Sequence, residues 1–243
     1  MAEILRWSGD GLTPGALTTA SAGTGDTPPL GIAGLPSIVS AGSRPPAIQA
    51  GGSEIAYAAW VLGTRTASAG RVYWTPSALA PSGAPLWFLR VVEGTTIRFQ
   101  VDMESTGRLN LRDQSAQVLQ QGATGVVQPG VTYRVEWAIQ SNGTISLSYF
   151  EGEGTTPVQQ LEGTIPAQHD GVWLGHTAGG AGYTGTMLFD DLLVVDTPTM
   201  PGPWVDPNAP AAASPFKYWD GSQYADLNAY VWDGADYIPV TTP

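Results

Sequence analysis

The sequence predicts an all-β protein, built as a sandwich or barrel of about a dozen short strands. Glycine (31 residues) and proline (20 residues) make up about a fifth of the 243 residues, well above their usual share of roughly 12%. No stretch has a convincing helical periodicity, and many short apolar runs are separated by turn residues. This combination is typical of strands joined by frequent turns.

The clearest predicted unit is an antiparallel hairpin over residues 133–150. Apolar residues alternate with polar ones in both arms, and Asn142 and Gly143 stand between them. Asn-Gly is a strong hairpin signal because both residues tolerate positive φ. One face of this hairpin should be buried, with Trp137 in the core.

Further strands are predicted on both sides of this hairpin. Residues 55–62 are apolar on both faces, as in a central strand covered on both sides. In the run 97–102, apolar residues alternate with Arg98, Gln100 and Asp102. The other predicted strands cover residues 71–74, 86–92, 108–112, 158–165, 172–175 and 187–195.

The chain is expected to consist of four parts. Composition assigns residues 1–54 to a Gly/Pro-rich segment with edge strands, 55–196 to the sandwich, 197–215 to a linker and 216–243 to a tail of two hairpins. The linker contains six prolines and an alanine run, which favour an extended, semi-rigid segment.

The tail repeats one pattern after 13 residues: Trp219-Asp-Gly followed by Tyr224, then Trp232-Asp-Gly followed by Tyr237. Asp-Gly favours a hairpin turn, and aromatic pairs stabilise the strands across it. A two-stranded hairpin of this size needs a neighbour. We therefore expect Trp219, Tyr224, Trp232 and Tyr237 to bind a partner, either another copy or another assembly component. A hairpin folded back on the sandwich is the alternative.

Charge and composition exclude several classes of partner. The formal net charge is −11, whereas nucleic acids and anionic membranes attract basic surfaces. Cysteine is absent, so there is neither a disulfide nor a thiolate metal site. No signal peptide is expected, and no stretch approaches the roughly 18 apolar residues of a membrane span. A protein of this kind would reach the outside of a cell by lysis or as part of a particle.

Two family resemblances follow from these patterns. From about residue 55 to 196, the Tyr-x-Val-x-Trp strand, the Asn-Gly turn, Val-Trp-Leu-Gly at 172–175, a glycine-rich loop and the closing strand 189–195 resemble the concanavalin A-like lectin/glucanase superfamily, which includes laminin G-like and pentraxin-like jelly rolls. This resemblance implies a jelly-roll β-sandwich. The Trp-Asp-Gly tail resembles repeats that end many minor tail and other virion proteins of actinobacterial phages.

Glucanases of the resembled superfamily place two carboxylates on one strand in a Glu-x-Asp-x-x-Glu arrangement, and this pattern is absent here. Glu151 and Glu153 share a face, but their Glu-Gly-Glu-Gly context favours a solvated loop. His169 and His176 are expected at the surface, with no nucleophile or third zinc ligand beside them. The sequence therefore predicts no enzymatic activity.

Glycan binding is the function that the resemblance favours. Trp60, Trp74 and Trp87 lie on central strands, where they are either core residues or platforms for sugar rings. Arg98, Asp102, Arg108 and Arg112 border one solvated face and could orient a glycan. Among these residues, Trp74, Trp87, Arg98 and Arg112 are the predicted glycan contacts.

The only cofactor that the resemblance implies is a structural calcium ion. An acidic residue of the last strand often helps to hold it in this superfamily, and Asp191 is the candidate. By alternation, Phe189, Asp191, Leu193 and Val195 should share a face, so the carboxylate would need a cation or hydrogen-bond donors. The alternative is an aspartate that caps nearby backbone N–H groups.

These observations together favour a non-catalytic phage virion protein, a minor tail or capsid decoration protein on the surface or tail of the particle. It would bind virion proteins or its own copies through the tail, as a homo-oligomer or within a symmetric assembly, and adhere to host glycan through the sandwich. A secreted bacterial carbohydrate-binding module and a glycoside hydrolase-like protein are the alternatives.

Overall fold

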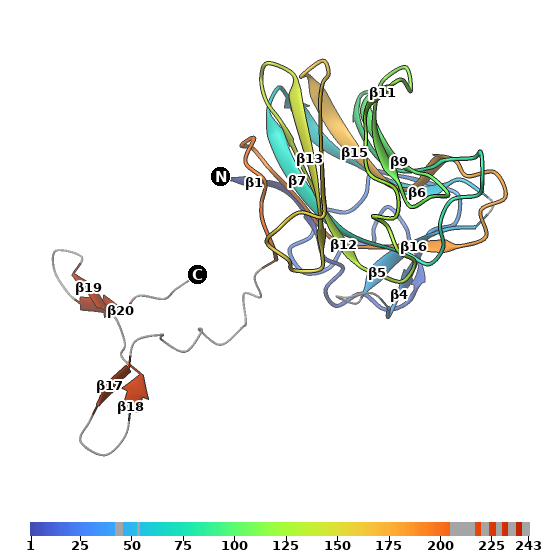
Figure 1. Ribbon diagram of the computed structural model, residues 1–243. Coiled ribbons are helices and arrows are strands. Elements are labelled where there is room, and N and C mark those ends of the chain that lie inside the picture. The colour runs from blue at the N-terminus through green and yellow to red at the C-terminus, as the bar shows by residue number, and fades with distance from the viewer. Residues whose placement is uncertain are drawn as a thin grey trace. The chain divides into compact units, whose positions relative to one another are not determined.

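The computed structural model describes residues 1–41, 46–52 and 54–204, together with four short strands of the C-terminal tail. The described residues form no helix, and the main part consists of two antiparallel sheets packed face to face (Figure 1). The predicted all-β jelly-roll sandwich is therefore confirmed. Within the described part of the chain, no helix is long and apolar enough to cross a membrane.

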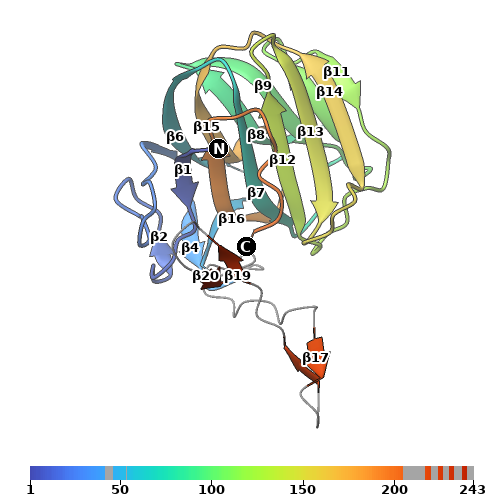
Figure 2. The same ribbon diagram turned by 90° about the vertical axis from the view of Figure 1, so that its left-hand side faces the viewer.

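One sheet has nine strands. In spatial order they are β14 (Gln159–Thr164), β13 (Thr144–Glu151), β12 (Tyr133–Ile139), β7 (Ser68–Pro76), β16 (Thr186–Val195), β5 (Ala47–Gly51), β4 (Ser37–Val39) and β2 (Gly15–Ala16), and β1 (Glu3–Trp7) also pairs with β16. Along one edge of β16, β5 pairs with the first half of the strand and β1 pairs with the second half (Figure 2). The N-terminal segment thus supplies strands of the sandwich, including a β1 that the sequence did not reveal.

The other sheet has seven strands. In spatial order they are β11 (Val118–Gln121), β10 (Leu109–Asp113), β9 (Thr96–Met103), β8 (Leu86–Glu93), β15 (His169–Gly179), β6 (Ala56–Arg65) and β3 (Gly31–Ala33). Alternation along β9 and β10 turns Phe99, Val101 and Leu111 into the core and sends the polar residues between them to the other face. That outward face is central to the sections below.

The core between the sheets is built on large aromatic side chains. Trp7, Trp60, Trp74 and Trp137 are all at most 1% exposed and belong to one apolar cluster. Trp137 lies on the predicted hairpin β12–β13, whose register runs from Tyr133 opposite Glu151 to Ile139 opposite Ile145. Gly70 of β7 pairs with Trp137 of β12, and a Cβ atom at position 70 would collide with the indole ring. The predicted core position of Trp137 is confirmed.

Part of the outward face of the nine-stranded sheet, over β7 and β12, is covered, which the sequence did not predict; this part is here called the covered face. Every residue of β12 is buried, including Arg134 and Glu136. The cover is the segment 197–203, here called the strap, drawn in orange across β7 and β12 in Figure 2. Gly202 of the strap accepts a hydrogen bond from Arg71 (2.9 Å) and donates one to Glu136 (3.3 Å). The strap belongs to the compact unit Met1–Pro203, so part of the expected linker 197–215 lies on the sandwich.

The last strand departs from the predicted alternation. The pairing of β16 with β7 is irregular between Asp190 and Leu193, and Asp191 takes a left-handed φ of 47°. This bulge turns Leu192 and Val194 toward the core. The expectation that Phe189 and Asp191 share a face is wrong, because one extra residue in a strand reverses the alternation after it.

The second compact unit is Trp204–Pro243, which contains the tail. In it, β17 (Lys217–Trp219) pairs with β18 (Tyr224–Asp226), and β19 (Tyr230–Trp232) pairs with β20 (Tyr237–Pro239). Trp219 stands opposite Tyr224 and Trp232 opposite Tyr237, so each repeat is an antiparallel strand pair as predicted. The predicted partner binding by these four residues concerns side chains that lie outside the described part.

Candidate functional site

The outward face of the seven-stranded sheet, here called the open face, gathers polar and aromatic side chains in rows across the strands. Pairing places Arg112 opposite Gln100, Gln100 opposite Arg90 and Arg90 opposite Trp173. A second row places Asn110 opposite Asp102 and Asp102 opposite Trp87. Residues far apart in sequence thus meet on one surface because strand register brings them together.

An aromatic pair forms one half of the open face. Tyr57 of β6 and Trp173 of β15 stack with ring centroids 5.1 Å apart and planes 10° apart, and both are half-buried. Gly171 and Gly175 lie on the same face of β15 on either side of Trp173, so no side chain from that strand crowds the indole. Rings held in this way offer a flat apolar surface, as sugar-binding proteins use.

A network of hydrogen bonds forms the other half. Arg112 donates to Asp102, whose carboxylate is fully buried, and to the carbonyl of Ala116 at 3.0 Å. Asn110 donates to both Asp102 (3.0 Å) and Glu104 (2.9 Å). These contacts fix the polar groups in place before any ligand arrives, which lowers the entropic cost of binding.

Arg90 lies between the two halves. Its Nε donates to Gln100 (3.1 Å), its Nη1 donates to the carbonyl of Thr177 (3.2 Å), and its guanidinium lies 5.0 Å from the ring centre of Trp87. Only 7% of the residue is exposed. Burial lowers the pKa of Arg90 below its ordinary value, and the effect of Tyr57 is smaller and opposite in direction.

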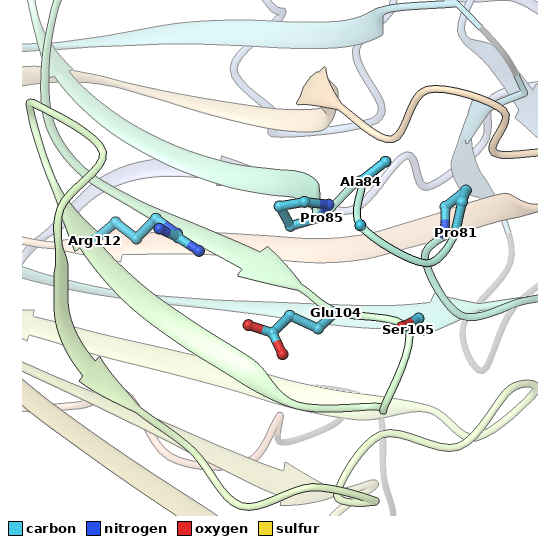
Figure 3. Close-up of a pocket in the computed structure, with 7 residues that line it drawn as sticks. Pro81, Ala84, Pro85, Glu104, Ser105 and Arg112 are labelled. Atoms are coloured by element: carbon cyan, nitrogen blue, oxygen red, sulfur yellow. The ribbon is translucent and has the colours of Figure 1, made fainter.

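Two hollows lie on this face. One, of about 280 Å³, is mainly apolar and is lined by residues that include Leu30, Val61, Asp170 and Trp173. The other, of about 290 Å³, lies between the loop before β8 and the β9–β10 turn. Figure 3 shows Arg112 and Glu104 directed toward one another there, with Pro85 nearby and Pro81 farther along the same loop.

The predicted glycan contacts fall in different places. Trp87 and Arg112 lie on the open face, whereas Arg98 lies at its far end, paired with Glu93 and bonded to the carbonyl of Gln168. Trp74 is a wrong prediction: it is 0% exposed and stacks on Phe88 at 4.1 Å inside the core. Strand register, which the sequence alone did not fix, turns Trp74 inward and Trp87 outward.

Asp191 is not placed as a calcium ligand. Its carboxylate pairs with the Arg71 guanidinium at 2.8 Å, and both side chains are almost fully buried. A guanidinium supplies the positive charge that the calcium ion was expected to supply. Among the residues that the structure describes, no group of three or more acidic or histidine side chains could hold a metal ion.

Both histidines are buried, contrary to the expected surface position. His169 is bonded to Ser68 (2.7 Å) and to the carbonyl of Ala167 (2.7 Å), and desolvation by burial lowers its pKa. His176 is bonded to the carbonyl of Gly179 (2.9 Å). In the sequence, His169 lies in a turn-like Gln-His-Asp-Gly stretch and His176 stands at a predicted strand end before a glycine-rich loop, whereas both belong to the long strand β15.

Sequence reasoning missed Tyr57, Arg90 and Trp173. The run 55–62 was expected to be covered on both sides, yet Val61 is 55% exposed because its face of β6 is the open one. Alternation in the sequence does place Tyr57 and Val61 on one face and Ala58 and Trp60 on the other, but both sets are apolar. Hydrophobicity alone therefore could not show which face is open.

One carboxylate pair was also overlooked. Asp102 and Glu104 are two positions apart, and Asn110 bonds to both. Asp102 is held by Arg112 and is fully buried, and Glu104 lies 3.8 Å from Arg108. Both carboxylates thus have cationic partners from the chain itself.

The chain matches no protein-family model and no curated protein sequence. Among solved structures, lectin UEA-II complexed with galactose has a TM-score of 0.51 at 8% identity, covering 81% of this chain and 100% of that one. A structure of lectin II from Ulex europaeus gives a TM-score of 0.50 at 8% identity, with 77% and 99% covered. The binding domain of Botulinum Neurotoxin DC in complex with SialylT gives 0.53 at 7% identity over 81% of this chain and 48% of that one, so this chain spans about half of its length. At such identities, the comparisons establish a lectin-like jelly-roll β-sandwich and nothing narrower.

Proposed function

We propose that the chain is a non-catalytic glycan-binding protein and that the open face of the seven-stranded sheet is its binding site. The observation that carries the proposal is the half-buried Tyr57–Trp173 stack beside an apolar hollow. In the same rows, Arg90, Gln100 and Arg112 supply fixed polar groups. An apolar surface with a few oriented polar groups is the usual composition of a ligand site.

The fold comparison supports the same proposal. The similar structures include a lectin complexed with galactose. Because fold similarity alone does not fix function, the site residues carry the argument.

A glycan array followed by calorimetry tests this proposal. Trp173→Ala should weaken binding of the selected sugar roughly tenfold or more, because stacking is lost, whereas Trp173→Phe should retain much of the affinity. Unchanged binding by Trp173→Ala would remove the open face as the site.

The absence of catalysis is part of the proposal. Glycoside hydrolysis needs one carboxyl group that donates a proton and a second that acts as base or nucleophile. Here Asp102 is fully buried and bonded to Arg112, and Glu104 lies 3.8 Å from Arg108, so both carboxyl groups are already engaged within the chain. A reducing-end assay on a polysaccharide panel should show no turnover. Turnover abolished by Asp102→Asn or Glu104→Gln would refute this part.

The tail favours a second role, attachment to a larger assembly. Two strand pairs with the same Trp-to-Tyr register are repeated in tandem, and two-stranded pairs are marginal alone. We propose that they attach the glycan-binding sandwich to a phage virion as a minor tail or decoration protein. A bacterial carbohydrate-binding module accounts for the open face equally well, but it gives the repeat no particular partner.

Truncation tests the attachment. A chain ending at Trp204 keeps the whole sandwich unit and should bind glycan normally, yet fail to self-associate or join the particle. Assembly at the level of the full chain would refute attachment through the tail and leave the glycan proposal standing.

A further inference from the structure

Arg90 is exceptional among the arginines of the open face. Arg98 pairs with Glu93, Arg108 with Glu104 at 3.8 Å, and Arg112 with Asp102. Within the described part of the chain, Arg90 has no carboxylate at ion-pair distance, and its two hydrogen-bond acceptors, Gln100 and the Thr177 carbonyl, are neutral.

Among the described residues, this arrangement leaves a buried positive charge with an aromatic ring beside it but no carboxylate partner. Neutral acceptors satisfy N–H groups but do not cancel charge, and a buried charge is costly unless it is paired. The lowered pKa of Arg90 reflects the same loss of water. Because Nε and one proton of Nη1 are engaged, Nη2 and the second proton of Nη1 remain for a ligand.

The surroundings of Arg90 indicate what such a ligand is. Trp173 stands opposite Arg90 on β15, and Trp87 lies under the guanidinium. An anionic group bound at Arg90 would therefore sit between two indole rings that can contact sugar rings. The chain as a whole carries a net charge of −11, so its overall charge does not attract anions. Binding of an acidic sugar would therefore depend on a local positive group such as Arg90.

We propose that the open face recognises an acidic sugar, carboxylated or sulfated, whose anionic group binds Arg90. This inference rests on the proposed glycan-binding function and narrows it to a ligand class. Guanidinium groups bind carboxylate and sulfate oxygens through parallel N–H donors, which supports both sources of the anion.

The test uses matched pairs of ligands with the full chain. Oligogalacturonate is compared with its carboxyl-reduced form, and a sulfated galactan oligosaccharide with its desulfated form, by isothermal titration. At least one acidic member should bind tenfold or more tightly than its neutral counterpart, as expected for a charged hydrogen-bonded contact.

Two variants test whether Arg90 is the group that binds the anion. Arg90→Gln should abolish the preference for the acidic member. Gln100→Glu should also abolish it, because the new carboxylate pairs with Arg90 from within, and it should do so without lowering the melting temperature. Arg6→Gln, which changes the net charge equally on the other sheet, is the control and should bind as the parent chain does.

The outcomes separate this inference from the proposed function. Equal binding of acidic and neutral members overturns the acidic-sugar inference alone, as does a preference that survives in a folded Gln100→Glu chain. If the chain binds none of these ligands and no glycan of a neutral array, both the glycan-binding proposal and this inference are overturned.

Discussion

The two outward faces of the sandwich carry similar residues but differ in whether the chain covers them and pairs their charges. On the nine-stranded sheet, Arg71 and Asp191 form a buried pair, and the strap covers them through Gly202. On the seven-stranded sheet, the Tyr57–Trp173 stack is left half-exposed, and Arg90 donates to two neutral acceptors, Gln100 and the Thr177 carbonyl.

The difference shows that charged residues on a sheet face do not by themselves mark a site. On the covered face, Arg134 is bonded to Glu136 at 2.5 Å and to the carbonyls of Gly152 and Gly154, so its charge and its donors are satisfied within the chain. The open face combines accessible aromatic rings with incomplete charge pairing. It is this combination, rather than polarity, on which the proposed ligand site is based.

The largest expected effect tests the core under both faces. Trp137→Ala should lower the free energy of unfolding by about 3–5 kcal/mol, because a fully buried indole is replaced by a cavity. Trp173→Ala, the same substitution on the open face, should cost much less. Urea unfolding measures both, and equal losses would contradict the distinction between a core tryptophan and a site tryptophan.

The next largest effect tests the strap over the nine-stranded sheet. A chain ending at Asp196 loses the strap, with its two hydrogen bonds to Arg71 and Glu136 and the contact of Met200 with Ala69 and Ala138. It should be less stable by about 1–2 kcal/mol, since hydrogen bonds to charged groups are partly replaced by water.

The matched control for the strap is the chain ending at Trp204, which removes only the tail unit. Its melting temperature should equal that of the full chain. The boundary near Thr197 that composition favours would therefore cut into the sandwich unit. Equal melting of both truncated chains would show that the strap adds no stability.

A smaller effect tests the contact between the two sheets. His169 of β15 bonds to Ser68 of β7, and burial lowers its pKa in the folded state. The unfolded chain then binds the proton more readily, so stability is present above the unfolded pKa of about 6.5 and is lost as pH falls below it. The slope cannot exceed about 1.4 kcal/mol per pH unit for one proton. Unfolding of the parent chain and of His169→Gln across this range checks the effect, and an unchanged slope in the variant would contradict it.

Much of the fold could be predicted from alternation, but the site could not be fully predicted. The hairpin β12–β13 and the polar alternation of β9 and β10 were evident because one face of each is apolar and the turns are marked. Trp74 and Trp87 look alike in sequence, and only the pairing with neighbouring strands shows that one stacks on Phe88 and the other lies opposite Asp102.

Other features depend on contacts between distant segments. The strap is a proline-containing stretch that resembles a linker, and only its bonds to Arg71 and Glu136 show that it covers a sheet. The bulge at Asp191 is a single-residue irregularity, which no periodic pattern can reveal. Arg90 is visible as a charged residue in an apolar strand, but the sequence could not show that no carboxylate of the described residues pairs with it, because that depends on the assembled face.

The smallest expected effect is no change at all, and it concerns the covered face. If Asp191 held calcium, a chelator would lower the melting temperature, because an ion that binds only the folded chain stabilises it. The Arg71 guanidinium instead lies 2.8 Å from that carboxylate in a nearly buried pair. We therefore expect identical melting in chelator and in excess calcium. Asp191→Asn, which leaves Arg71 without its charge partner, should destabilise the chain in both conditions equally. A calcium-dependent shift that disappears in Asp191→Asn would instead show that Asp191 binds the metal ion in addition to its pairing with Arg71.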